Sequence, residues 1–157
     1  MRFEIRWWPS DGVWASSMTH HVWADAEFVA DHWPELAADI QARYAGKYDT
    51  LVGCGLAGIP WVVALGVGLR VPYVLVRKPG DAKPRATFTP IVGRFGPERR
   101  CLFVDDLVGS GGTRRHVAFT LAMAQAELVG TVTVDSALSD AYGAGWDHKR
   151  RRAEAVR

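Results

Sequence analysis

Two adjacent carboxylates, Asp105 and Asp106, end an apolar run and are followed by a loop of small residues. A carboxylate pair accepts hydrogen bonds from neighbouring hydroxyls and can orient a magnesium ion. The loop offers backbone N–H groups with little steric hindrance, and a helix that opens at its end favours a dianionic phosphate. This order predicts a site for a ligand with sugar hydroxyls and a phosphate. The alternative is an ordinary strand–turn–helix connection. The loop residues are Val108, Gly109, Ser110, Gly111, Gly112 and Thr113.

The elements that must position these residues alternate between strands and helices. Apolar alternation and short apolar runs predict strands over residues 3–7, 50–54, 72–76, 87–92, 100–105 and 131–137. Apolar residues at helical spacing predict helices from Asp25 through Tyr44, over 60–69 and over 113–128, and Pro34 could split the first of these in two. This order predicts an α/β fold with a central, mainly parallel sheet flanked by helices.

Three unusual loops begin at Gly53, Arg77 and Asp105, each at the carboxyl end of an expected strand. Ligands of open parallel sheets bind outside these strand ends. We therefore expect the three loops to meet at one rim. The loop of Gly55, Leu56, Ala57 and Gly58 would contribute backbone N–H groups there, and as an isolated feature it would be an ordinary turn.

Length and composition indicate one globular domain over residues 1–157, with a core at about 50–137, a Trp-rich cap over 1–48 and a tail over 138–157. The net charge of +2 is too small to argue for nucleic acid, and the basic residues 149–152 are expected to be solvated. The longest apolar stretch, 59–69, is about half the ~20 residues of a membrane span. Two cysteines in apolar runs and charged residues near the N-terminus favour a cytoplasmic protein with reduced thiols.

The run from Leu102 to Thr113 resembles the signature of type I phosphoribosyltransferases, which bind 5-phosphoribosyl-1-pyrophosphate. Gly109 departs from the pattern, since Thr or Ser is more usual at its position. The resemblance implies a Rossmann-like core with a small hood. It also implies that the catalytic pair Asp105 and Asp106 holds the ribose hydroxyls together with Mg²⁺, while residues 108–113 hold the 5-phosphate.

The same resemblance assigns the neighbouring loops. Residues 55–58 correspond to the pyrophosphate loop, where a strained cis peptide would fall at Gly55–Leu56 or Leu56–Ala57. Arg77 and Lys78 would neutralise the pyrophosphate, unless they are only solvated surface charges. Lys83 and Arg85 lie in the mobile loop that closes over the reacting sugar in the family, and we expect them to be catalytic.

The implied reaction transfers a 5-phosphoribosyl group to a nucleobase with release of pyrophosphate. Tyr142 or Trp146 would stack on the base, or else anchor the C-terminal tail, and the Trp-rich N-terminus is the other candidate for the hood. The acceptor base is left undecided, because parts of the sequence resemble orotate phosphoribosyltransferases and others resemble adenine phosphoribosyltransferases. The family resemblance also implies a homodimer. The alternative is a donor-binding regulator that contacts nucleic acid through Arg114, Arg115 and the basic tail. A P-loop phosphate binder is disfavoured because the Gly-Lys-Ser/Thr ending is missing.

Overall fold

The computed structural model describes residues 26–78, 89–106 and 110–134. Within them a five-stranded sheet has the order β3-β2-β1-β4-β5, and only β3 runs antiparallel to its neighbour. The α/β fold class predicted from the sequence is confirmed. In chain order, the elements are α2 (Ala26–Tyr44), β1 (Thr50–Cys54), α3 (Ile59–Leu69), β2 (Tyr73–Val76), β3 (Ile91–Val92), β4 (Arg100–Asp105), α4 (Gly112–Met123) and β5 (Glu127–Thr133).

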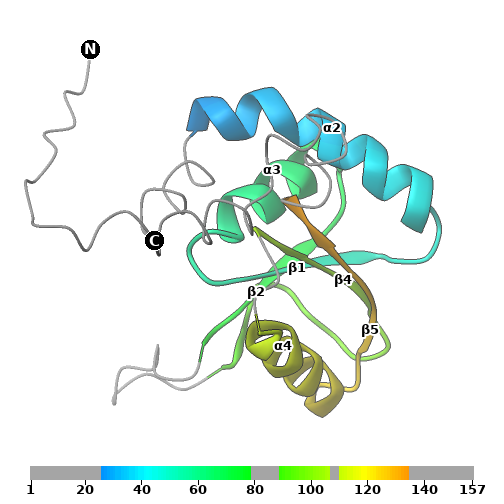
Figure 1. The fold of residues 1–157 in the computed structure, drawn as a ribbon. Coiled ribbons are helices and arrows are strands. Elements are labelled where there is room, and N and C mark those ends of the chain that lie inside the picture. The colour runs from blue at the N-terminus through cyan, green and yellow to red at the C-terminus, as the bar shows by residue number, and fades with distance from the viewer. Residues whose placement is uncertain (1–25, 79–88, 107–109, 135–157) are drawn as a thin grey trace, which may run out of the picture.

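The sheet is covered on both faces, with α2 and α3 on one side and α4 on the other (Figure 1). Alternate residues of β1 and β4 face the α2–α3 layer and the α4 layer. Leu51 and Leu102 face the fully buried Trp61 of α3, whereas Val52 and Phe103 pack with Val117 and Leu121 of α4. Burial on both faces explains why β1 and β4 appear in the sequence as continuous apolar runs.

Helix α2 packs against α3, and two aromatic contacts fix its position. The Trp33 ring lies over Gly68 of α3, where an added Cβ would be 2.4 Å from a ring carbon. At the other end of α2, the Tyr44 ring lies over Gly130 of β5. Of the tryptophans in the expected N-terminal cap, the described residues include only Trp33, which is half-buried.

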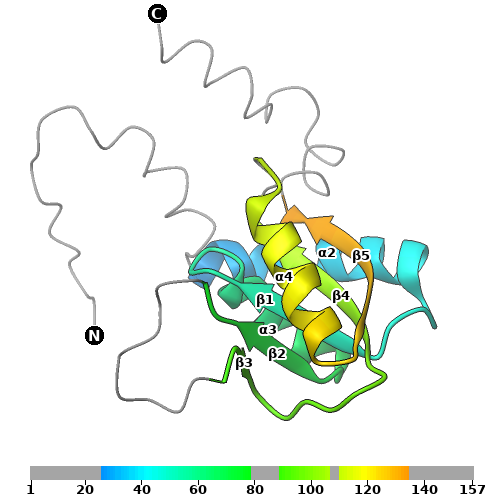
Figure 2. The same ribbon diagram turned by 90° about the horizontal axis from the view of Figure 1, so that it is seen from below.

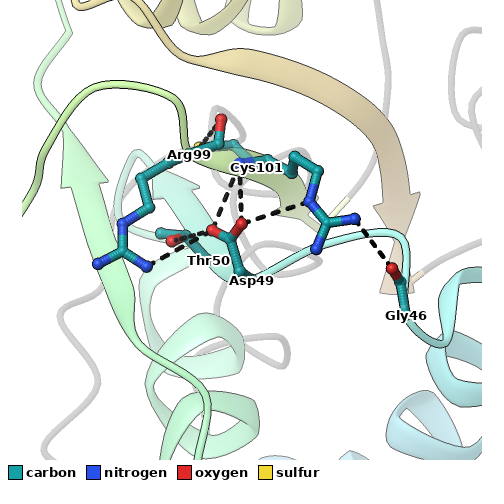
Figure 3. A network of polar contacts seen from close by, with 6 residues as sticks. Gly46, Asp49, Thr50, Arg99 and Cys101 are labelled. Atoms are coloured by element: carbon teal, nitrogen blue, oxygen red, sulfur yellow. Dashed lines mark hydrogen bonds and ion pairs between the residues drawn. The ribbon is translucent and has the colours of Figure 1, made fainter.

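At the amino ends of β1 and β4, Asp49 joins the two strands (Figure 3). Its carboxylate accepts hydrogen bonds from the Thr50 hydroxyl at 2.9 Å and from the Arg100 backbone N–H at 3.3 Å. Its own backbone N–H donates to the Arg100 carbonyl at 3.0 Å. Both the Arg99 and Arg100 guanidinium groups also lie within ion-pairing distance. This network fixes the register of β1 and β4 at the end of the sheet opposite the loops that begin at Gly53, Arg77 and Asp105.

Two expected helices differ from the structure. Pro34 does not split α2, which runs unbroken past it because Leu36 and Ile40 continue the buried stripe begun by Val29. The helix expected over 113–128 ends at Met123. Gln125 adopts a left-handed conformation (φ 58°), which turns the chain so that β5 begins at Glu127 instead of at Thr131.

Three expected strands lie partly or wholly outside the described residues, including residues 135–137 of the strand expected over 131–137. Of the strand expected over 87–92, Ile91 and Val92 form β3, and residues 87 and 88 lie outside the described ranges. The strand expected over 3–7 also lies outside them. In the described part of the chain, no helix combines the length and the apolar character needed to cross a membrane.

Candidate active site

The carboxyl ends of β1, β2 and β4 and the first turn of α4 enclose a pocket of about 270 Å³. Figure 2 looks onto the α4 side of the sheet, where this helix lies across β1 and β4. The structure thus brings the three predicted loops together at one rim. The pocket is lined by Cys54, Gly55, Leu56, Ala57, Lys78, Phe103, Asp105, Asp106, Ser110, Gly111, Gly112, Thr113 and Arg114.

The two carboxylates of the motif are both almost completely buried, each 7% exposed. The backbone N–H of Asp106 donates to Oδ1 of Asp105 at 3.1 Å. Burial, followed by the negative charge of Asp106, raises the pKa of Asp105 to about 7, and the cation of Lys78 acts in the opposite direction. A buried carboxyl with a raised pKa, such as that of Asp105, next to a second carboxylate in a pocket is typical of a functional site.

The loop after β1 turns sharply at Gly55, whose φ is 81°. Its carbonyl accepts a hydrogen bond from the Ile59 N–H at 3.3 Å, so the turn closes directly into α3. No peptide bond between described residues is cis, so neither Gly55–Leu56 nor Leu56–Ala57, the two places open to a cis bond, holds one. The left-handed conformation of Gly55 already provides the change in chain direction.

The first turn of α4 opens into the pocket. Gly111 caps the helix in a left-handed conformation (φ 75°), and no acidic side chain occupies the first turn. The Arg115 guanidinium donates to the Ser110 carbonyl at 3.1 Å and so holds the start of the helix. The unpaired N–H groups of a helix start and its positive dipole suit an anion.

Lys78 reaches the pocket from the end of β2, whereas Arg77 is not among the lining residues. The side chain of Lys78 passes over Gly55, where an added Cβ would lie 2.8 Å from Cε and 2.9 Å from Nζ. Gly58 does not line the pocket either, and instead packs against Asp105 from behind. The remaining predicted site residues lie outside the described ranges: Lys83, Arg85, Val108, Gly109, Tyr142 and Trp146.

The sequence analysis did not assign Cys54, Phe103 and Arg114 to the site. Cys54 and Phe103 point toward the α4 side at the ends of buried strands, a position that the period-two pattern could have revealed. Arg114 follows Thr113 directly, and its Nε donates to the Thr131 hydroxyl at 3.1 Å. From the sequence, Arg114 is expected only as a nucleic-acid contact of the alternative function.

Comparison with known proteins agrees with this geometry. Residues 25–150 match the family model described as "Phosphoribosyl transferase domain". An orotate phosphoribosyltransferase of Methanosarcina mazei is 32% identical over 108 residues, which cover 69% of this chain and 55% of that protein. The chain therefore spans little more than half the length of this relative.

Two solved structures share the fold. An orotate phosphoribosyltransferase of Francisella tularensis superposes with a TM-score of 0.59 at 24% identity, covering 73% of this chain and 55% of that one. An adenine phosphoribosyltransferase of Thermoanaerobacter pseudethanolicus has a TM-score of 0.57 at 22% identity, covering 72% and 70%. At these identities the likeness establishes the arrangement of strands and helices.

Proposed function

From the premise that the chain belongs to the phosphoribosyl transferase domain family, we propose that it transfers a 5-phosphoribosyl group from 5-phosphoribosyl-1-pyrophosphate to a nucleobase. One observation carries the proposal. The carboxylate pair, the start of α4 and the cation of Lys78 line a single pocket. Ribose hydroxyls, a phosphate and a pyrophosphate need these three kinds of partner.

In the proposed reaction, the bond from the anomeric carbon to the pyrophosphate oxygen breaks, a bond from a ring nitrogen of the base forms, and the proton of that nitrogen is released to solvent. The protein need not supply a nucleophile. Its part is to hold donor and base in line and to stabilise the charge that develops on the leaving pyrophosphate.

Each part of the pocket takes one group of the donor in this proposal. Asp105 and Asp106 accept the ribose hydroxyls, and the backbone N–H groups from Ser110 to Thr113 receive the 5-phosphate. Lys78 and the backbone of residues 55–57 hold the pyrophosphate.

The carboxylate oxygens of the pocket suit Mg²⁺, a hard cation that takes oxygen ligands. In proteins, substrate and water molecules usually supply several of these ligands. The described residues contain no cluster of three acidic, His or Cys side chains, so Asp105 and Asp106 would share the ion with oxygens of the donor. When bound, Mg²⁺ would neutralise negative charge on the pyrophosphate.

For the acceptor we propose a pyrimidine base, with orotate as the first candidate. The support is that sequence relatives at 31–32% identity are named orotate phosphoribosyltransferases. Adenine is the second candidate, because an adenine phosphoribosyltransferase is among the solved structures that share the fold.

The test is pyrophosphate release from the donor and Mg²⁺ with a panel of orotate, uracil, adenine, guanine, hypoxanthine and xanthine. We expect release with one base, and loss of nearly all of it when Asp105 and Asp106 are both replaced by Asn. Asp39→Asn, which changes an ion-paired carboxylate on α2 that does not line the pocket, is the matched control. Full activity of the double variant would refute the site, and donor binding without turnover on any base would instead favour a donor-binding regulator.

A further inference from the structure

We propose that His116 is a positioning residue that fixes Lys78 in the pocket by holding the backbone carbonyl of Arg77. The inference rests on the proposed function, because it assigns Lys78 to the pyrophosphate, and it adds a residue that lies outside the pocket. The central observation is a hydrogen bond of 2.7 Å between Nε2 of His116 and the Arg77 oxygen.

The chemistry of this hydrogen bond fixes its direction. A carbonyl oxygen can only accept, so Nε2 of His116 carries the hydrogen and donates it. The imidazole is half-buried on α4, and its partner is 39 residues away in sequence. The bond therefore joins α4 to the end of β2, a strand that β1 separates from β4 in the sheet.

The backbone of Arg77 is held on both sides of its Cα. Its N–H donates to the Pro90 carbonyl at 3.0 Å, directly after the last β2–β3 pair, Val76 with Ile91. Its carbonyl is held by His116 from the α4 layer. The peptide units before and after Arg77 are thus each held by a different element, so φ and ψ of Arg77 have little freedom, and this restricts the direction in which the next residue leaves the strand.

That next residue is Lys78, one of the cations that line the pocket. Its side chain lies against Gly55 and lines the same pocket as Asp105, where the donor would bind. A lysine side chain loses considerable rotamer freedom when it is placed, so a fixed backbone reduces the cost of holding it there. His116 would thus strengthen pyrophosphate binding without contacting the ligand.

Two amide replacements separate hydrogen bonding from packing. In His116→Gln, the amide nitrogen can occupy the position of Nε2 and restore the donor. In His116→Asn, the same amide is one carbon too short to reach the Arg77 oxygen. We expect the Asn variant to raise KM for the donor and the Kd for inorganic pyrophosphate about tenfold with a small change in kcat, and the Gln variant to recover most of the loss.

A second variant keeps the test valid if His116→Asn is poorly folded. Lys78→Met removes the cation that His116 is proposed to position. In that background His116→Gln and His116→Asn should bind pyrophosphate equally, because the residue they act through is gone. Thermal unfolding of each variant separates a loss of stability from a loss of positioning.

The outcomes distinguish this inference from the proposed function. Equal KM and Kd values for wild type, His116→Gln and His116→Asn would overturn the positioning role while leaving the activity in place. An equal penalty from Asn and Gln, or one that persists in Lys78→Met, would also overturn it. Absence of both turnover and pyrophosphate binding in the wild type would overturn the proposed function, and the inference with it.

Discussion

Gly58 lies directly behind Asp105 and leaves no room for a side chain. A Cβ at residue 58 would be 3.0 Å from Oδ1 of Asp105 and 3.2 Å from the Val104 carbonyl oxygen. Gly58 is also the N-cap of α3, with a φ of −81° that any residue can adopt. The requirement for glycine is therefore steric. The close approach that glycine allows brings the positive end of α3 up to the carboxylate pair.

Gly58→Ala should displace the Asp105 carboxylate and crowd the Val104 carbonyl oxygen. Because a small misplacement at a reacting centre is costly, we expect kcat/KM to fall at least about tenfold while the free energy of unfolding changes by about 1 kcal/mol or less. Steady-state kinetics and urea unfolding measure the two effects. Gly96→Ala is the matched control, since a Cβ there meets nothing within 4 Å, and equal activity of both variants would contradict the prediction.

The protonation of Asp105 should make folding pH-dependent. Its pKa is raised from 3.8 to about 7 in the folded protein, so the folded state holds the proton more tightly than the unfolded chain. This contribution is fully present below about pH 4 and is lost as the pH rises to about 7. Asp105→Asn removes the ionisation.

We therefore expect Asp105→Asn to gain stability relative to wild type between about pH 4 and about pH 8, by more than about 1 kcal/mol. Urea unfolding across this range, without Mg²⁺ or donor, is the measurement. Asp39→Asn, which changes an exposed ion pair on α2, is the control for the loss of a carboxylate. Stability curves of wild type and Asp105→Asn that run parallel would rule out the raised pKa.

The contact between Tyr44 and Gly130 should matter for stability alone. A Cβ at residue 130 would lie 2.3 Å from Cε1 of Tyr44, so Gly130→Ala forces the ring of α2 away from β5. We expect a loss of about 1–3 kcal/mol, with KM for the donor unchanged. In a double-mutant cycle with Tyr44→Ala the two losses should not add, and full additivity would show that the ring is not the obstacle.

Removing the Asp49 carboxylate should loosen the amino ends of β1 and β4 (Figure 3). Because the network is partly exposed, we expect Asp49→Ala to cost about 1–2 kcal/mol of stability and to leave kcat/KM unchanged. The substitution also removes one cause of the raised pKa of Cys101, which burial and Asp49 bring to about 12. Chemical unfolding and steady-state kinetics test it, with Asp39→Ala as a surface control that should cost about 0.5 kcal/mol or less.

The parts of the fold that the sequence predicted well are those with strong local signals. The continuous apolar runs of β1 and β4 fall where expected because burial on both faces leaves an unmistakable pattern. Pro60 marks the start of α3 for a similarly local reason. The N–H groups of a first helical turn have no partner within the helix, so a proline, which has no N–H, is well tolerated there. The small-residue loops identified the rim because parallel strands end on one side of a sheet.

The errors and omissions have tertiary causes. The end of α4 depends on Gln125 adopting a left-handed conformation, to which a non-glycine residue gives little clue. Helix α2 continues through Pro34 because of its packing, which outweighs the lost hydrogen bond. His116 bonds to a carbonyl 39 residues away, and no spacing in the sequence connects the two.

The order β3-β2-β1-β4-β5 has a consequence for folding. The Gly55 and Asp105 sides of the pocket belong to strands that are neighbours in space but distant along the chain, with β2 and β3 formed by residues between them. A chain that has paired β1 with β2 but has not yet docked β4 holds only part of the pocket. Ligand binding should therefore select the completely folded sheet, and the ligand would serve as a probe of complete folding as well as a substrate.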